Sequence, residues 1–167
     1  QAVFRTEAFA EFNDLTIDLS ECASYKRIIS AKVDVEVNNC KFIGNPEVTG
    51  TTYAVIVGEG AGALISDVVA EINGSSFTNV SYGVADNRNG QNVKSFIIDD
   101  CEFEKANVEL SASEEITFTN NTLENGWINV AVYDKTADLT VTVTGNTFEK
   151  NGNTTSTTNR IQAGSTI

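Results

Sequence analysis

The chain has 167 residues, a length typical of one domain, and carries 11 Lys and Arg against 23 Asp and Glu, with no His. A net charge of −12 argues against nucleic acid and anionic membranes as partners, because both are bound through Lys and Arg. The absence of His removes the commonest general base and metal ligand. No apolar run approaches the roughly 20 residues that would cross a bilayer, so we expect no membrane insertion.

One pattern recurs along the chain. It consists of an apolar residue, any residue, an apolar residue, two polar residues, a small or polar residue, any residue, and Phe or Leu. A weaker copy at 10–17 precedes five full copies, at Val35–Phe42, Ala70–Phe77, Phe96–Phe103, Ile116–Leu123 and Val141–Phe148. The alternation of apolar and polar residues indicates β-strand. The polar pair is rich in Asn, Asp and Gly, which tolerate left-handed backbone, so each copy predicts two short strands joined by a bend.

A third strand is expected at a fixed distance after each Phe or Leu. Five and seven residues after it stand Tyr82 and Val84, Val108 and Leu110, and Ile128 and Val130; after longer turns stand Tyr53 and Val55, and Asn159 and Ile161. The extra residues fall in the turns around 45–50 and 153–158. Three strands per repeat, with insertions confined to turns, predict an all-β fold: a single-stranded parallel β-helix of about six coils. Residues 1–167 would form one domain of a longer chain.

Stacked coils would place equivalent side chains in ladders along the helix axis. The expected ladders are Phe42, Phe77, Phe103, Leu123 and Phe148; Val37, Ile72, Ile98, Phe118 and Val143; and Cys40, Ser75, Cys101, Asn121 and Asn146. Within the third ladder, Asn121 and Asn146 would satisfy each other by an amide–amide hydrogen bond. Cys40 and Cys101 would lie roughly 9.6 Å apart, too far for a disulfide, which favours buried free thiols.

Several of these segments resemble a known family. Asn38–Phe42, Asn120–Leu123 and Gly145–Phe148, with Phe12–Ile17 as an opening coil, resemble the repeats of the pectate-lyase-like superfamily over roughly residues 8–163. The resemblance implies a right-handed helix. The superfamily contains lyases, hydrolases, tailspikes and adhesins, so the resemblance is informative about fold and not about activity. Abundant Asn, Thr and Ser with sparse Lys favour export, and we expect a bacterial extracellular or cell-surface location.

Catalytic candidates are few, and we expect no catalytic residue. Hydrolases of this superfamily would need paired carboxylates, but Asp99 and Asp100 occupy the bend of a repeat. Lyases would need a cation such as Ca²⁺, and Glu36 and Glu71 share an outward position with Asp34 beside them. No cofactor is expected apart from calcium there. A polysaccharide lyase or glycoside hydrolase acting on acidic polysaccharide is retained as the alternative function.

The sequence offers better candidates for a binding surface than for a catalytic site. Glu109, Asn129 and Arg160 would stack outward on three consecutive coils, and Trp127 stands at the turn that enters this face. An aromatic ring beside carboxylate, amide and guanidinium groups is suited to a sugar, although Trp127 could instead cover a coil edge. We therefore expect a non-catalytic module that binds polysaccharide or a host or matrix glycan, or serves as an adhesive stalk or rigid spacer. Its open coil ends would favour self-association.

Overall fold

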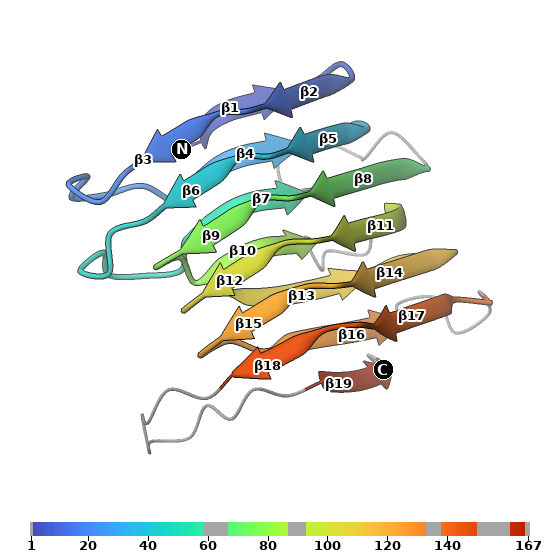
Figure 1. Ribbon diagram of the computed structural model, residues 1–167. Coiled ribbons are helices and arrows are strands. Elements are labelled where there is room, and N and C mark those ends of the chain that lie inside the picture. Colours follow the sequence, from blue (N-terminus) through green and yellow to red (C-terminus); the bar gives the residue numbers. More distant parts are fainter. Residues whose placement is uncertain (1, 59–66, 87–92, 133–137, 150–160, 166–167) are drawn as a thin grey trace.

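The computed structural model describes residues 2–58, 67–86, 93–132, 138–149 and 161–165, and in these ranges the chain forms β-strands and turns. All strand pairs are parallel, and they build three sheets (Figure 1). Sheet A contains β1 (Ala2–Thr6), β4 (Arg27–Ala31), β7 (Tyr53–Val57), β10 (Tyr82–Asp86), β13 (Asn107–Ser111), β16 (Ile128–Val132) and β19 (Ile161–Ser165). Sheet B contains β2 (Ala10–Asn13), β5 (Val35–Asn38), β8 (Val68–Asn73), β11 (Val93–Asp99), β14 (Glu115–Thr119) and β17 (Thr140–Thr144). Sheet C contains β3 (Thr16–Asp18), β6 (Lys41–Ile43), β9 (Ser76–Thr78), β12 (Glu102–Glu104), β15 (Thr122–Glu124) and β18 (Thr147–Glu149).

The chain passes through sheets A, B and C in turn and then begins the next coil, so each strand pairs with the strand three elements later. The coils wind in a right-handed sense from β1 at one end to β19 at the other (Figure 1). The predicted parallel β-helix with three strands per coil is confirmed. The described part of the chain holds no helix with the length and apolar character needed to span a bilayer.

The bend between sheets B and C depends on one left-handed residue per coil. The second residue of each polar pair has positive φ: Asn39 (52°), Gly74 (56°), Asp100 (53°), Asn120 (55°) and Gly145 (70°). Asn, Asp and Gly adopt this conformation at the lowest cost, which explains why the polar pair recurs. A second left-handed residue follows sheet C at Asn79, Lys105 and Asn125.

The three predicted ladders form the part of the core that sheets B and C contribute, and the inward side chains of sheet A complete it. Phe42 pairs with Phe77, Phe77 with Phe103, Phe103 with Leu123, and Leu123 with Phe148. The rings of Phe42 and Phe77 stack at 5.1 Å, and those of Phe77 and Phe103 at 4.9 Å. The second ladder also has the expected register, and Phe12 extends it into the first coil. Ile17 extends the Phe ladder in the same way.

The third ladder is joined by hydrogen bonds. The Cys40 N–H donates to the Ser75 hydroxyl at 3.0 Å, and the Cys101 N–H donates to the Asn121 side-chain oxygen at 2.9 Å. Asn121 in turn donates to Asn146, as predicted. The cysteines are free, with Cys40 and Cys101 buried and Cys22 half-buried.

Two predicted registers in sheet A are wrong. Tyr82 pairs with Asn107 instead of Val108, one residue from the expected register, and a bulge between Tyr82 and Val84 adds a second residue, so that Val84 pairs with Val108 instead of Leu110. The bulge places Gly83 against the Phe ladder, where a Cβ would lie 2.7 Å from Phe103 Cδ1.

The second error is in the last coil. Ile161 pairs with Ile128, and Ala163 pairs with Val130, the partner expected for Ile161. The turn before β19 is therefore longer than we expected. Asn159 lies outside the described residues.

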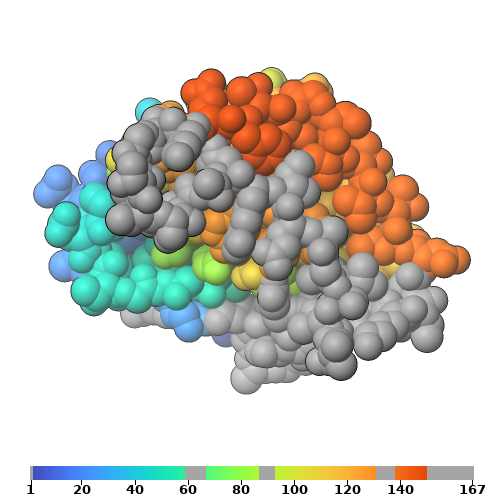
Figure 2. All heavy atoms as spheres, turned by 90° about the horizontal axis from the view of Figure 1, so that it is seen from below, coloured from blue at the N-terminus to red at the C-terminus, as the bar shows by residue number. Residues whose placement is uncertain are grey.

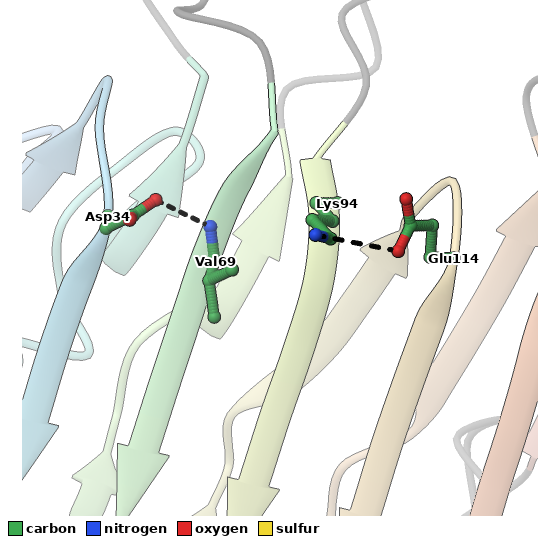
Figure 3. Close-up of polar contacts among 4 residues, drawn as sticks. All are labelled: Asp34, Val69, Lys94 and Glu114. Carbon is green, nitrogen blue, oxygen red and sulfur yellow. Dashed lines mark hydrogen bonds and ion pairs between the residues drawn. The ribbon is translucent and has the colours of Figure 1, made fainter.

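The corner between sheets A and B is held by polar contacts between neighbouring coils (Figure 3). The Val69 N–H donates to Asp34 Oδ1 at 2.9 Å, and Lys94 Nζ lies 3.7 Å from Glu114 Oε2. The opposite corner carries two long connections, between β3 and β4 and between β6 and β7, which project beyond the other turns (Figure 1). Self-association through coil ends stays a prediction. The first coil exposes large apolar side chains, namely Val3, Phe4, Phe9 and Leu15.

Candidate functional site

The outward row of sheet A brings Glu109 and Asn129 together. Glu109 in β13 pairs with Asn129 in β16, and Asn129 Nδ2 donates to Glu109 Oε1 at 3.3 Å. Both side chains are partly exposed. The next member of this row is Gln162, which pairs with Asn129. The expected stacking of Arg160 on Asn129 is therefore wrong, and Arg160 itself lies outside the described residues.

Trp127 enters the same face at the turn before β16. Its backbone N–H donates to Asn107 Oδ1 at 3.2 Å, and its ring meets that of Tyr82 edge to face, with centroids 5.9 Å apart and planes at 90°. Tyr82 stacks on Tyr53 of the preceding coil at 5.3 Å and 13°. Tyr53, Tyr82 and Trp127, all partly exposed, form an aromatic strip along the start of sheet A.

Sequence reasoning placed Trp127 and Glu109 correctly on one face but missed the tyrosines. It treated Tyr53 and Tyr82 only as members of the third strand, by their distance from the preceding Phe, and gave them no place on this face. One signal could have found them. Each of these residues is a tyrosine and not a phenylalanine, and its hydroxyl group favours a partly exposed position on a strand over a core position.

Two charged residues, Glu109 and Arg27, act on Tyr53, the first residue of the aromatic strip. Partial burial, followed by the Glu109 carboxylate, raises the pKa of Tyr53, while Arg27 opposes the shift. Arg27 lies beside Tyr53, as its pairing partner in β4. The face thus combines three aromatic rings with carboxylate, amide and guanidinium groups. A phenol with a raised pKa stays neutral at physiological pH, so Tyr53 is equipped to donate a hydrogen bond and not to act as a base.

The residues considered for hydrolysis take part in the bend. Asp99 Oδ1 accepts hydrogen bonds from Thr119 Oγ1 at 2.5 Å and from Asn120 Nδ2 at 2.9 Å. Asp100 is the left-handed residue of its coil, with φ 53°.

The outward row that contains Asp99 continues toward the first coil as an asparagine ladder, which sequence reasoning missed. In it Asn73 donates to Asn38 at 3.1 Å, and Asn38 donates to Asn13 at 3.0 Å.

The residues considered for calcium form an acidic column. Glu36 pairs with Glu71, as expected, and also with Glu11. Desolvation, followed by the charges of Glu11 and Glu71, raises the pKa of Glu36. Asp34 instead accepts the Val69 N–H. Among the described residues no group of three or more His, Cys, Asp or Glu is arranged to hold a metal ion.

No protein-family model, curated protein or solved structure matches this chain. What this face could bind must therefore be inferred from its geometry. It offers flat apolar rings next to hydrogen-bond donors and acceptors, on a rigid sheet. Such a combination can hold a polar ring molecule.

Proposed function

We propose that this chain is a non-catalytic extracellular module that binds glycans on the outer face of sheet A. The observation that carries the proposal is the edge-to-face contact of Tyr82 with Trp127, beside the hydrogen-bonded pair Glu109 and Asn129. A sugar ring presents an apolar face of C–H groups and an equator of hydroxyls. Aromatic rings suit the first, and carboxylate and amide groups suit the second.

The net charge supports neutral glycans over acidic ones. The chain carries −12, and an acidic column lies on sheet B. The column spans the first three coils, and its carboxylates would repel an approaching polyanion within a Debye length of about 10 Å. This electrostatic argument also disfavours the alternative function, a lyase or hydrolase acting on acidic polysaccharide.

The core supports a second role as a rigid spacer. The stacked Phe42, Phe77 and Phe103 rings and the hydrogen-bonded third ladder continue from coil to coil without a break in register. A solenoid of this kind holds a binding face at a fixed distance from whatever carries it.

Membership of the pectate-lyase-like superfamily and a bacterial surface location belong to the same proposal.

A glycan array followed by calorimetry tests the binding role. We expect wild type to bind neutral oligosaccharides and Trp127→Ala to lose at least about tenfold in affinity, because the exposed ring no longer packs on a sugar. Phe9→Ala is the matched control, since Phe9 is 57 % exposed on the first coil, away from the strip. Two results would contradict the proposal: no glycan bound by wild type, or equal binding by Trp127→Ala.

The same protein preparation tests the alternative. Incubation with polyuronates, with and without a chelator, should give neither ultraviolet absorbance from unsaturated products nor new reducing ends. Sustained product formation by wild type would replace the binding proposal with the enzymatic one.

A further inference from the structure

A hollow lies at the corner where sheet C turns into sheet A. It measures roughly 230 Å³ and is lined by Asn45, Pro46, Val48, Thr52, Asn79, Val80, Ser81 and Lys105. Thr52 and Ser81 immediately precede Tyr53 and Tyr82, so the hollow adjoins the aromatic strip. Pockets for drug-sized ligands are usually about 300–1,000 Å³, and this smaller space suits a single sugar unit.

The outer wall of the hollow is a fixed structure. It is formed by the long connection between β6 and β7. When the structure is viewed from below, this part of the chain lies at the left side of the molecule, in cyan and teal (Figure 2). Asn45 Nδ2 donates to the Cys22 carbonyl at 3.1 Å, and Asn45 Oδ1 accepts the Glu47 N–H at 2.8 Å. Gly44 packs so closely on the next turn that a Cβ there would lie 2.3 Å from the Asn79 carbonyl oxygen.

The lining is divided into an apolar and a polar part. Pro46, Val48 and Val80 supply the apolar surface. On the polar side, the hydroxyls of Thr52 and Ser81 are occupied, since each accepts the other residue's backbone N–H at 3.0 Å. In contrast, the Asn79 side-chain amide and the Lys105 ammonium make no hydrogen bond or ion pair with the described part of the chain. These two groups are available to a ligand.

We infer that this hollow seats the acetamido group of an N-acetylhexosamine, within a glycan held by the aromatic strip. An acetamido group pairs a methyl with an amide, as the lining pairs three apolar side chains with a neutral amide and a cationic donor. The methyl would pack on Val48 and Val80, and the carbonyl oxygen would accept from Asn79 or Lys105. This inference rests on the proposed function, whose ligand class it narrows.

The surrounding charge favours a neutral sugar over a sugar acid. The backbone of Asn79 is bonded to that of Glu104 and the backbone of Lys105 to that of Glu124, and both glutamate side chains line the adjoining outer face of sheet C. Their carboxylates repel an anionic sugar acid, whereas an acetamido sugar carries no charge and is not repelled.

Nuclear magnetic resonance with two disaccharides of the same linkage tests the inference. Di-N-acetylchitobiose carries acetamido groups, and cellobiose carries hydroxyls in their place. We expect di-N-acetylchitobiose to shift the backbone amide signals of Asn79, Ser81 and Lys105 and to bind at least about fivefold more tightly than cellobiose, because its methyl group is buried. Val48→Ser should remove this preference. Val141→Ser, which changes a valine that is 44 % exposed on sheet B, should retain it.

The outcomes separate this inference from the proposed function. Equal binding of both sugars by wild type, or a preference that survives Val48→Ser, overturns the acetamido site and leaves the glycan-binding face standing. Shifts at the hollow that persist undiminished in Trp127→Ala support the hollow and contradict the role of the strip. The absence of any shift with either sugar at millimolar concentration overturns both, and a tighter fit for glucuronate than for N-acetylglucosamine overturns the acetamido site alone.

Discussion

Asn121 donates from its side-chain amide to Asn146 Oδ1, 3.1 Å away in the next coil. The same amide nitrogen donates to the Ile98 carbonyl at 3.1 Å, and its Oδ1 accepts the Cys101 N–H at 2.9 Å. Because Asn121 is only 1 % exposed, these bonds satisfy a polar side chain in the core and tie three coils together.

Asn121→Ala should therefore destabilise the fold by about 3 kcal/mol, since it leaves the Cys101 N–H and Ile98 carbonyl unsatisfied and opens a cavity. Asn121→Cys should cost less, because Cys101 fills the same position in the neighbouring coil and donates to backbone carbonyls through sulfur. Urea unfolding with an unchanged slope measures both. A Cys variant as unstable as the Ala variant would show that a thiol cannot replace the amide at this position, and would contradict the equivalence of Cys101 and Asn121 in the ladder.

Gly83 has no room for a side chain. A Cβ there would lie 2.7 Å from Phe103 Cδ1 and 3.0 Å from Phe77 Cγ, so Gly83→Ala should cost about 2 kcal/mol through overpacking. A double-mutant cycle with Phe103→Leu supplies the control, because Leu already occupies this ladder position at Leu123. The smaller side chain should make room and reduce the cost of Gly83→Ala; strictly additive effects in urea unfolding would contradict the close contact.

The core could be predicted from the sequence because each repeat is short and fixed in length. From Val37 to Phe42 the chain makes one bend with one left-handed residue, so aligning the copies also aligned their inward side chains. Sheet A was harder. Its strands follow turns of variable length, and the bulge at Gly83 depends on a contact with Phe103 that is distant in sequence. A shift of one residue moves a strand's side chains to the other face, which is why Tyr82 lies outward although Val108, its expected partner, is buried.

Lys105 occupies a backbone conformation that suits asparagine. Its φ is 51°, and the equivalent residues of neighbouring coils, Asn79 and Asn125, have φ 55°. Lys105→Asn should raise the free energy of unfolding by about 0.5 kcal/mol, and Asn125→Lys should lower it by a similar amount. Thermal unfolding of the two variants checks the pair. A loss of stability in Lys105→Asn would mean that the lysine side chain stabilises the turn in a way that the backbone does not reveal.

The cysteines should differ sharply in reactivity. Burial raises the pKa of the Cys101 thiol to about 12, so at pH 8 only about one molecule in ten thousand carries the thiolate. Cys22 is half-buried, while Cys40 is buried like Cys101. Iodoacetamide on the folded protein should modify Cys22 alone, and unfolding in urea should expose all three, as measured by mass spectrometry of peptides. Modification of Cys101 before Cys22 would contradict the packing of the third ladder.

The candidate site was predictable only where it depends on one coil and its neighbour. Glu109 and Asn129 pair across a single boundary with turns of equal length, and their contact was expected. The aromatic strip spans three coils and includes the bulged strand, so its tyrosines were missed. The hollow beside it depends on a loop packed on a distant turn, a contact that no local pattern encodes.

Repulsion within the acidic column of sheet B should make stability depend on pH. Desolvation, together with Glu11 and Glu71, raises the folded-state pKa of Glu36 above its ordinary value of 4.5. A raised carboxyl pKa means that the folded protein binds the proton more tightly than the unfolded chain does. The resulting stabilisation is fully present below pH 4.5 and is lost as the pH rises through the folded-state pKa.

Glu36→Gln should therefore raise the melting temperature at neutral pH, where three stacked carboxylates repel one another; this gain should shrink as the pH falls through the folded-state pKa and be smallest below pH 4.5. Glu47→Gln, on an exposed turn, removes the same charge outside the column and controls for net charge. Melting curves from acidic to neutral pH measure both variants. If Glu36→Gln and Glu47→Gln gave the same profile, the effect would belong to the overall charge of −12 and not to the column.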